Sequence, residues 1–332
     1  MSAAVSLFDH LPDGRPVHAI ALQGPRLAAR LLTMGATVQD LRLQGIDRPL
    51  VLGFPNLAPY LDAGLYVGAI VGRFANRIGG AAFTLDGVTH PLDRNFRGRH
   101  LLHGGVDGLH HQLWQIDEVG VDHAILSVRL PDGHMGFPGD LRIRAEISVA
   151  KDALALVLEA SSDAPTPCNL AHHGYFDLDG SGDIRSHRLE IAAESYLPVD
   201  ADLIPTGQIA PVAGTAFDFR DPREIGAAAY DHNFCLAPAR KGLRPVARLV
   251  GGSGVALWIE TTEPGLQLYD GRHFDGINGL DGRIYGPHAG LALETQGWPD
   301  APNHPAFPDS ILRPGQIYRA ETRYRFGQSG EK

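Results

Sequence analysis

Two short stretches of the chain carry side chains that could transfer protons. Glu294 follows the apolar run Leu291–Leu293 and opens a segment dense in proline, aromatic and amide groups, Thr295–Pro305. A carboxylate at the end of a strand, beside such a loop, can act as a general base over a polar ligand. The motif Ala171–Phe176 contains His173, whose imidazole could supply the matching acid. These types of residue predict acid–base chemistry in a cleft.

Two more polar residues stand in settings that a core would not choose. Arg77 lies in the glycine-bounded segment Gly72–Gly80, and His103 is followed by Gly104 and Gly105. A surface salt bridge is the default interpretation of the arginine. For His103, and for His173 taken alone, a structural histidine with a backbone hydrogen bond and a ligand-binding histidine are both open, because glycines allow close backbone approach.

Other kinds of site are not supported by the motifs present. The 16 histidines invite a metal, yet the chain has neither His-Glu-x-x-His nor Cys-x-x-Cys. In a strand the adjacent pairs His110–His111 and His172–His173 would point to opposite faces. We therefore predict no metal site. The chain also lacks the Gly-x-Ser-x-Gly elbow of a hydrolase, and Gly251–Gly254 lacks the lysine of a phosphate loop and is typical of a hairpin turn.

Two further polar segments have ordinary local explanations. In Asp231–Phe234 the acid and the amide favour a turn in which they bond their own backbone. Gln267 lies between Leu266 and Leu268 in a predicted strand, so the leucines would take the buried face and Gln267 would face a cleft or solvent.

The elements that must hold these residues are mainly strands. Apolar and polar residues alternate with the period of a half-buried strand in 124–130, 141–149, 154–160, 187–191 and 255–260. With 40 Gly and 24 Pro, few windows could hold a long helix. Asn56–Leu65 and Pro222–Ala229 are the best short-helix candidates, and no βαβ alternation is present. We predict an all-β fold, one large antiparallel β-sandwich, with residues 1–332 as a single domain and disorder only at the last few residues.

Charge and cysteine content limit the kinds of partner and the cellular compartment that we expect for the protein. A net charge of −9 argues against a nucleic-acid surface, which needs clustered Lys and Arg. Two cysteines, Cys168 and Cys235, fit buried thiols in a reducing compartment. Because the N-terminus resembles no signal peptide and no apolar run approaches the roughly 20 residues of a membrane helix, we expect a cytoplasmic protein, monomeric or homodimeric.

Taken together, the motifs resemble the aldose 1-epimerases, also called galactose mutarotases. The family's order and approximate spacing are found in Gly72–Ile78, Leu102–Gly105, His173–Phe176, Asp231–Phe234, Leu293–Gln296 and Leu312–Gly315. Each motif alone is weak, but the set in order is hard to obtain by chance.

The resemblance implies a galactose mutarotase-like supersandwich that interconverts the α and β anomers of a free aldose without a cofactor. By motif, His173 resembles the general acid, Glu294 the general base and His103 the second histidine of the site. The residues that resemble sugar ligands are Asn76, Arg77, Asp231 and Gln267, with Tyr175 a weaker candidate. Glu294 would have to be ionised to act first, and Arg77 or a neighbouring donor could keep it so.

Departures from the family pattern leave the sugar open. Many members have Asn-His-Ser-Tyr-Phe-Asn where this chain reads His-His-Gly-Tyr-Phe-Asp at 172–177, and Asp270 stands where threonine is frequent. Asp270 could bond a sugar hydroxyl or belong to a turn. The alternatives are a hexose 6-phosphate epimerase, for which Arg94, Arg97 and Arg99 would supply cations unless they form a solvated loop, and a non-catalytic sugar-binding protein.

Overall fold

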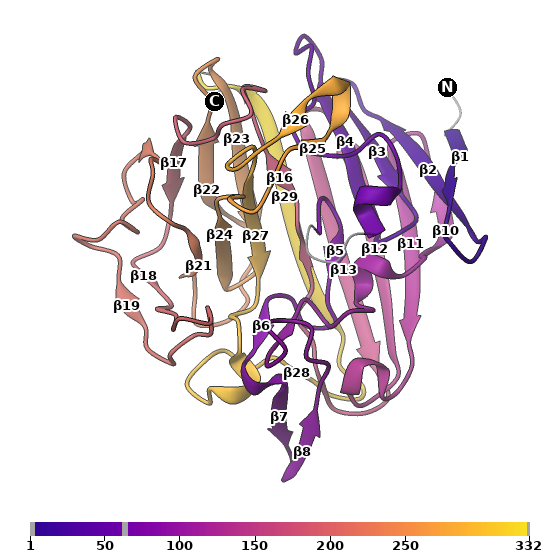
Figure 1. Cartoon of the computed structure of the whole chain (residues 1–332), viewed down its shortest axis with the longest axis vertical. Coiled ribbons are helices and arrows are strands. Elements are labelled where there is room, and N and C mark those ends of the chain that lie inside the picture. Colours follow the sequence, from indigo (N-terminus) through magenta and orange to yellow (C-terminus); the bar gives the residue numbers. More distant parts are fainter. Residues whose placement is uncertain (1–3, 62–65, 331–332) are drawn as a thin grey trace.

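A nine-stranded antiparallel sheet forms the largest layer of the molecule. The computed structural model describes residues 4–61 and 66–330. The order across the sheet is β10 (Gln115–Val119), β11 (His123–Leu130), β12 (Leu141–Ala150), β13 (Ala153–Ser162), β29 (Tyr318–Gln328), β23 (Val255–Thr261), β22 (Arg244–Val250), β17 (Arg188–Ile191) and β20 (Arg223–Glu224). The last long strand, β29, thus lies in the middle of the sheet, as Figure 1 shows in yellow.

Alternation in the sequence produces these strands. In β12 every second residue from Leu141 to Val149 is buried, and β13 repeats the pattern in register with Ala150 opposite Ala153. All five predicted strands are present, with ends that differ by at most two residues. The prediction of an all-β fold is confirmed, and Gly251–Gly254 does form the turn between β22 and β23.

Two smaller sheets face the large one. One contains, in order, β1 (Ala4–His10), β2 (Pro16–Gln23), β3 (Leu27–Leu32) and β4 (Thr37–Leu43). The other contains β16 (Tyr175–Phe176), β27 (Leu291–Gln296), β24 (Gly265–Tyr269), β21 (Asp231–Cys235), β18 (Ser195–Tyr196) and β19 (Ala210–Pro211). Side chains from all three sheets meet in one buried apolar cluster, where each Leu or Ile removed from water stabilises the fold by about 1.5–3 kcal/mol.

Strands β27 and β24 of the six-stranded sheet are buried on both faces, and this positions the polar residues. In β27, Leu291 and Leu293 enter the core, so Glu294 points to the opposite face. In β24, Leu266 and Leu268 do the same and place Gln267 beside Glu294, its register partner. The outer face of this sheet therefore carries polar groups that are shielded from bulk water.

Short pairs of strands and 3-10 turns complete the described chain. The pairs are β5 (Ile70–Val71) with β15 (Ala171–His172), β6 (Arg77–Ile78) with β9 (Leu101–Leu102), β7 (Ala82–Leu85) with β8 (Val88–Pro91), β14 (Thr166–Pro167) with β28 (Ile311–Leu312), and β25 (Ile277–Asn278) with β26 (Ile284–Tyr285). The 3-10 turns are η1 (Ala58–Leu61), η2 (Gly79–Ala81), η3 (Leu109–His111), η4 (His134–Gly136), η5 (Leu280–Gly282) and η6 (Ala301–Asn303).

Of the two predicted short helices, one is wrong and the other lies only partly within the described residues. The prediction of a helix over Pro222–Ala229 is wrong, because Arg223 and Glu224 pair with Leu189 and Arg188 at the edge of the large sheet. Within Asn56–Leu65 the described part contains only η1, and residues 62–65 lie outside the described residues. The predicted disorder at the last few residues concerns mainly Glu331 and Lys332, which also lie outside them.

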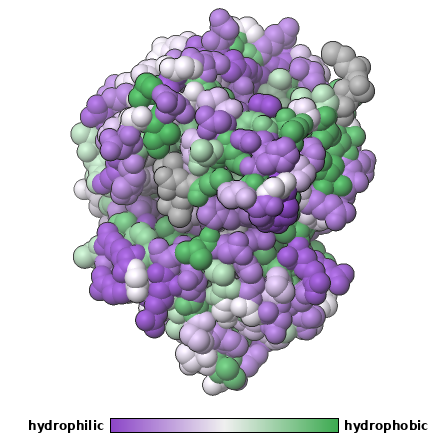
Figure 2. Space-filling model, turned by 45° about the vertical axis from the view of Figure 1, so that its right-hand side comes forward, coloured by the Kyte–Doolittle hydropathy of each residue, from purple (hydrophilic) through white to green (hydrophobic). Residues whose placement is uncertain are grey.

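The surface mixes residue types. Figure 2 shows a face on which hydrophilic and hydrophobic residues are interspersed. Within residues 4–61 and 66–330, no helix is long and apolar enough to cross a membrane. Both cysteines are free, Cys168 fully buried and Cys235 partly so.

Candidate active site

Segments far apart in the sequence meet around one cavity of about 420 Å³. That volume lies in the range of small-molecule sites. All the predicted site residues line it except Gln267, which is 2% exposed beneath the floor and bonded to Asp231. The predicted residues on the cavity wall are Asn76, Arg77, His103, His173, Tyr175, Asp231 and Glu294.

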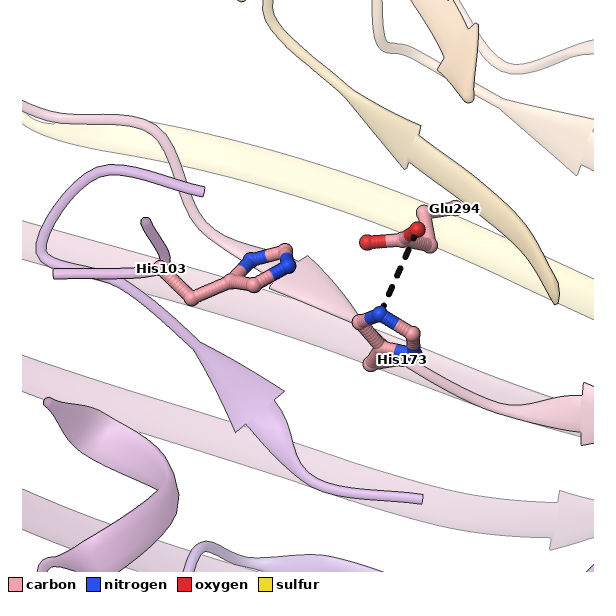
Figure 3. Close-up of side chains that lie close together, drawn as sticks. All are labelled: His103, His173 and Glu294. Atoms are coloured by element: carbon pink, nitrogen blue, oxygen red, sulfur yellow. Dashed lines mark ion pairs between the residues drawn. The ribbon is translucent and has the colours of Figure 1, made fainter. Parts of the chain in front are cut away.

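The imidazole of His173 and the carboxylate of Glu294 face each other across the cavity floor. His173 Nε2 lies 3.5 Å from Glu294 Oε1, and their side chains are 4% and 2% exposed (Figure 3). The backbone of His173 is fixed by hydrogen bonds with Gly68 and Ala69. Glu294 is held by the pairing of β27 with β24.

Burial favours the neutral form of each member of this pair. It lowers the pKa of His173 to about 4. Burial also raises the pKa of Glu294 well above its usual range; repulsion from Asp231 adds to the rise and attraction to Arg77 opposes it. Burial therefore opposes the expected ionisation of Glu294, and Arg77 offsets only part of this effect.

The guanidinium of Arg77 forms its ion pair with Asp231 rather than with Glu294. Its Nη2 lies 2.9 Å from Asp231 Oδ2, and Gln267 Nε2 donates to the other carboxylate oxygen at 2.6 Å. Burial works against the charged form of Asp231, but attraction to Arg77 and the hydrogen bonds from Arg77 and Gln267 together lower its pKa. Two predictions are corrected here. Arg77 is 6% exposed and forms no surface salt bridge, and Asp231 begins strand β21 because it pairs with Tyr269 of β24.

His103 is locked in one orientation. Its Nδ1 accepts a hydrogen bond from the backbone N–H of Asn76 at 3.1 Å, and the backbone N–H of His103 donates to the carbonyl of Asn76. Burial and repulsion from His173 lower its pKa far below the usual value, so the ring is neutral and its proton sits on Nε2. Gly104 has a positive φ of 86°, and a Cβ there would lie 2.0 Å from the carbonyl oxygen of Gly72. Glycine is thus required for this close approach.

Three residues of the cavity floor, His103, His173 and Glu294, lie close enough together to bind a metal ion, but the hydrogen bonding of the two imidazole rings does not suit one. His103, His173 and Glu294 each offer a ligand atom within 4.8 Å of the others. A histidine ligand normally donates its other ring N–H to an acceptor. Here the other nitrogen of His103 faces the N–H of Asn76, and Nδ1 of His173 has no partner. The arrangement fits proton transfer better than metal binding.

The sequence reasoning missed several aromatic residues of the wall. The ring of Tyr66 lies 4.5 Å from the ring of His103 and 5.8 Å from that of His173. Phe96 packs under Arg77 at 4.6 Å. Tyr269 also lines the cavity and could have been found, since it lies two residues after Gln267 on the same face of β24. No comparable signal marked Tyr66.

The comparison with known proteins decides the family. The model of the family described as aldose 1-epimerase matches residues 18–325. The chain belongs to the aldose 1-epimerase family. It is therefore a member of an isomerase family.

Relatives and solved structures of that family match nearly the whole chain. The galactose mutarotase of Rattus norvegicus is 40% identical over 98% of this chain and 99% of its own. The aldose 1-epimerase of Escherichia coli is 35% identical over 95% and 96%. An aldose epimerase homologue from C. elegans superposes with a TM-score of 0.88 at 31% identity, covering 93% of this chain and 98% of its own. A galactose 1-epimerase from Lactobacillus acidophilus gives 0.86 at 27%, covering 98% of each.

The two positions that left the sugar open do not line the aldose 1-epimerase cavity. The carboxylate of Asp270 is 1% exposed, accepts hydrogen bonds from Arg272 and lies against the backbone N–H of Tyr230. It therefore stabilises the turn after β24. His172 is 3% exposed and points into the core.

Proposed function

We propose that the protein interconverts the α and β anomers of a free aldose, such as galactose, glucose or a related pentose or hexose, without a cofactor. The observation that carries this proposal is the buried contact of 3.5 Å between His173 Nε2 and Glu294 Oε1 on the floor of the cavity. Opening a pyranose requires one proton to leave the anomeric hydroxyl and another to reach the ring oxygen. A pair that holds one proton between two groups can serve both needs.

The proposed reaction begins when the anomeric hydroxyl of the sugar reaches Glu294. The pair carries one proton, which burial favours on the carboxyl of Glu294; this proton passes to His173 across their contact, and Arg77 then stabilises the carboxylate. Glu294 takes the proton of the anomeric hydroxyl while His173 protonates the ring oxygen. The open-chain aldehyde turns about its C1–C2 bond and recloses with the transfers reversed.

The remaining site residues have supporting roles in this proposal. His103 is a neutral Nε2–H donor toward the cavity, so it orients an oxygen of the sugar rather than supplying a proton. Asp231 and Arg77 offer acceptors and donors to the sugar hydroxyls, with Asn76 beside them and Gln267 holding Asp231 in place. The aromatic ring of Tyr175, 5.0 Å from that of His173, closes one side.

The alternative of a hexose 6-phosphate substrate is less well supported. Arg97 and Arg99 both bind Asp202, each at 2.7 Å, so the two guanidinium groups already share one carboxylate. A phosphate would have to displace that carboxylate. A non-catalytic sugar-binding role would give no reason for a histidine and a glutamate to share a proton in the floor.

The experiment is the optical rotation of freshly dissolved α-D-galactose against time. We expect the protein to accelerate the approach to the final rotation, and Glu294→Gln to lose at least about 10²-fold in kcat. Glu194→Gln, a substitution of the same type at an exposed side chain, should leave the rate unchanged. Full activity of Glu294→Gln would refute the assigned base. No acceleration with galactose, glucose, arabinose or xylose would direct the search to phosphorylated sugars and then to binding alone.

We also propose a monomer or homodimer that works in the cytoplasm, as one domain, without nucleic-acid or membrane partners. The net charge of −9 supports the absence of a nucleic-acid surface.

A further inference from the structure

The neighbours of the two proposed catalytic residues point away from the cavity into the core. His172 precedes His173, and Thr295 follows Glu294, so alternation along the chain sends both side chains to the opposite face. His172 and Thr295 are each 3% exposed. A buried polar side chain requires a partner, and these two share one.

That shared partner is Tyr324 on β29. Its hydroxyl lies 3.4 Å from His172 Nδ1, and the two rings pack edge to face at 5.6 Å. Burial raises the pKa of Tyr324, and a hydrogen bond with Thr295 opposes the rise. The phenol is fully buried and also packs on Phe176 at 5.2 Å. A single rigid side chain thus touches the strands that carry the acid and the base.

Threonine hydroxyls extend the contact into the large sheet. Thr295 Oγ1 lies 2.5 Å from Thr322 Oγ1, which lies 3.2 Å from Thr261 Oγ1. Thr261 in turn donates to the carbonyl of Glu321 at 3.1 Å. This hydroxyl chain fastens β27 to β29 and β23, the centre of the nine-stranded sheet.

The size of His172 explains why position 174 is a glycine. A Cβ on Gly174 would lie 2.6 Å from His172 Cε1, closer than side chains approach. Gly174 has no left-handed φ, so it is needed here for space rather than for conformation. Histidine at 172 and glycine at 174, where many relatives carry asparagine and serine, therefore belong together.

We propose that His172, Tyr324 and Thr295 form a positioning chain behind the cavity, which sets the contact between His173 and Glu294. The inference rests on the proposed function for its kinetic test. None of its three members touches the cavity, and β29 reaches both catalytic strands at once, through Tyr324 to His172 and through Thr322 to Thr295. Loss of its hydroxyl should misplace the acid relative to the base while leaving the sugar ligands where they are.

The first test is Tyr324→Phe, which keeps the ring and removes the hydroxyl. We expect kcat to fall about tenfold with KM unchanged, because small misplacements of reacting groups are costly and the sugar-hydroxyl ligands lie on other strands. The matched control is Tyr60→Phe, a buried tyrosine whose hydroxyl accepts from the N–H of Phe54 in another cluster. It should lower Tm without changing kcat. A kcat for Tyr324→Phe within twofold of wild type, or a change in KM alone, would show that Tyr324 is merely structural.

A second readout does not depend on turnover. The imidazole nitrogen NMR shifts of His173 should change in Tyr324→Phe and stay unchanged in Tyr60→Phe. If wild type and Tyr60→Phe both lack mutarotation, the proposed function fails, while unchanged shifts in Tyr324→Phe overturn the positioning chain separately. Gly174→Ser should lower Tm, and the double variant His172→Asn/Gly174→Ser should recover most of the loss. A double variant no more stable than Gly174→Ser alone would refute the steric coupling.

Discussion

The buried ion pair of Arg77 and Asp231 should affect stability and activity for different physical reasons, and the substitution Asp231→Asn allows the two effects to be measured separately. The pair is 2.9 Å long, with side chains 7% and 15% exposed. Removing one charge leaves the other buried and uncompensated, which costs about 3–5 kcal/mol. At about 2 °C per kcal/mol for a large domain, we expect Tm to fall by at least about 6 °C. A solvent-accessible pair of the same length, Arg220 with Asp218, offers the control, because Asp218→Asn should leave Tm nearly unchanged.

The same substitution should weaken catalysis for a different reason. A hydrogen bond from a sugar hydroxyl to a charged acceptor contributes about 1.5–3 kcal/mol, so its loss should lower kcat/KM roughly 10–100-fold. The double variant Arg77→Met/Asp231→Asn removes both charges and should regain most of the lost Tm while kcat/KM stays low. Calorimetry and polarimetry on the same samples measure the two effects. If Asp231→Asn melts at the wild-type temperature, or the double variant recovers activity with stability, the reasoning about this pair is wrong.

Further predictions concern protonation, the aromatic wall and metals. The profile of kcat/KM against pH should be bell-shaped. The pair of His173 and Glu294 takes up a second proton only near pH 4, where His173 titrates, and loses its one proton only well above the usual range of Glu294. A profile limited by a single group near pH 6.5 would contradict the shared proton. Burial lowers the pKa values of His103 and His172, so the unfolded chain binds these protons more readily and Tm should fall as the pH falls from about 6.5 toward 4, as a melting series will measure. The opposite pKa shifts of His173 and Glu294 offset each other over most of this window. Tyr66→Phe should keep more than half of kcat/KM. Tyr66→Ala should lower kcat/KM about tenfold, because the rings of His103 and His173 lose the aromatic ring that packs against them. Equal rates for the two variants would show that the ring of Tyr66 has no role in the site. Dialysis against a chelator should leave the mutarotation rate unchanged, and a loss that zinc restores would contradict the orientation of His103.

Sequence patterns predicted the parts of the fold that local periodicity controls. The strands β12 and β13 were found because one face of each is buried throughout. Asp231 was assigned to a turn from its own preferences, but pairing with Tyr269, 38 positions later, overrides them. Pro222–Ala229 failed as a helix for the same reason, since edge pairing with β17 determines its backbone.

The site was predictable in its members and not in its geometry. The motifs named His173 and Glu294, yet these residues are far apart in the sequence and meet only through the packing of β15 against β27. Local sequence carries no distance between them. Burial, which opposes the ionised form of Glu294, is likewise a property of the assembled sheets.

The central place of β29 in the nine-stranded sheet has a consequence for synthesis of the chain. β13 and β23 both pair with β29, whose residues leave the ribosome after those of both partners. Until Tyr318–Gln328 emerges, the nascent protein exposes two long unpaired strand edges, which are templates for aggregation. Chaperone dependence during translation should therefore end only when this strand inserts, and a ribosome stalled before it should hold a sheet divided in two.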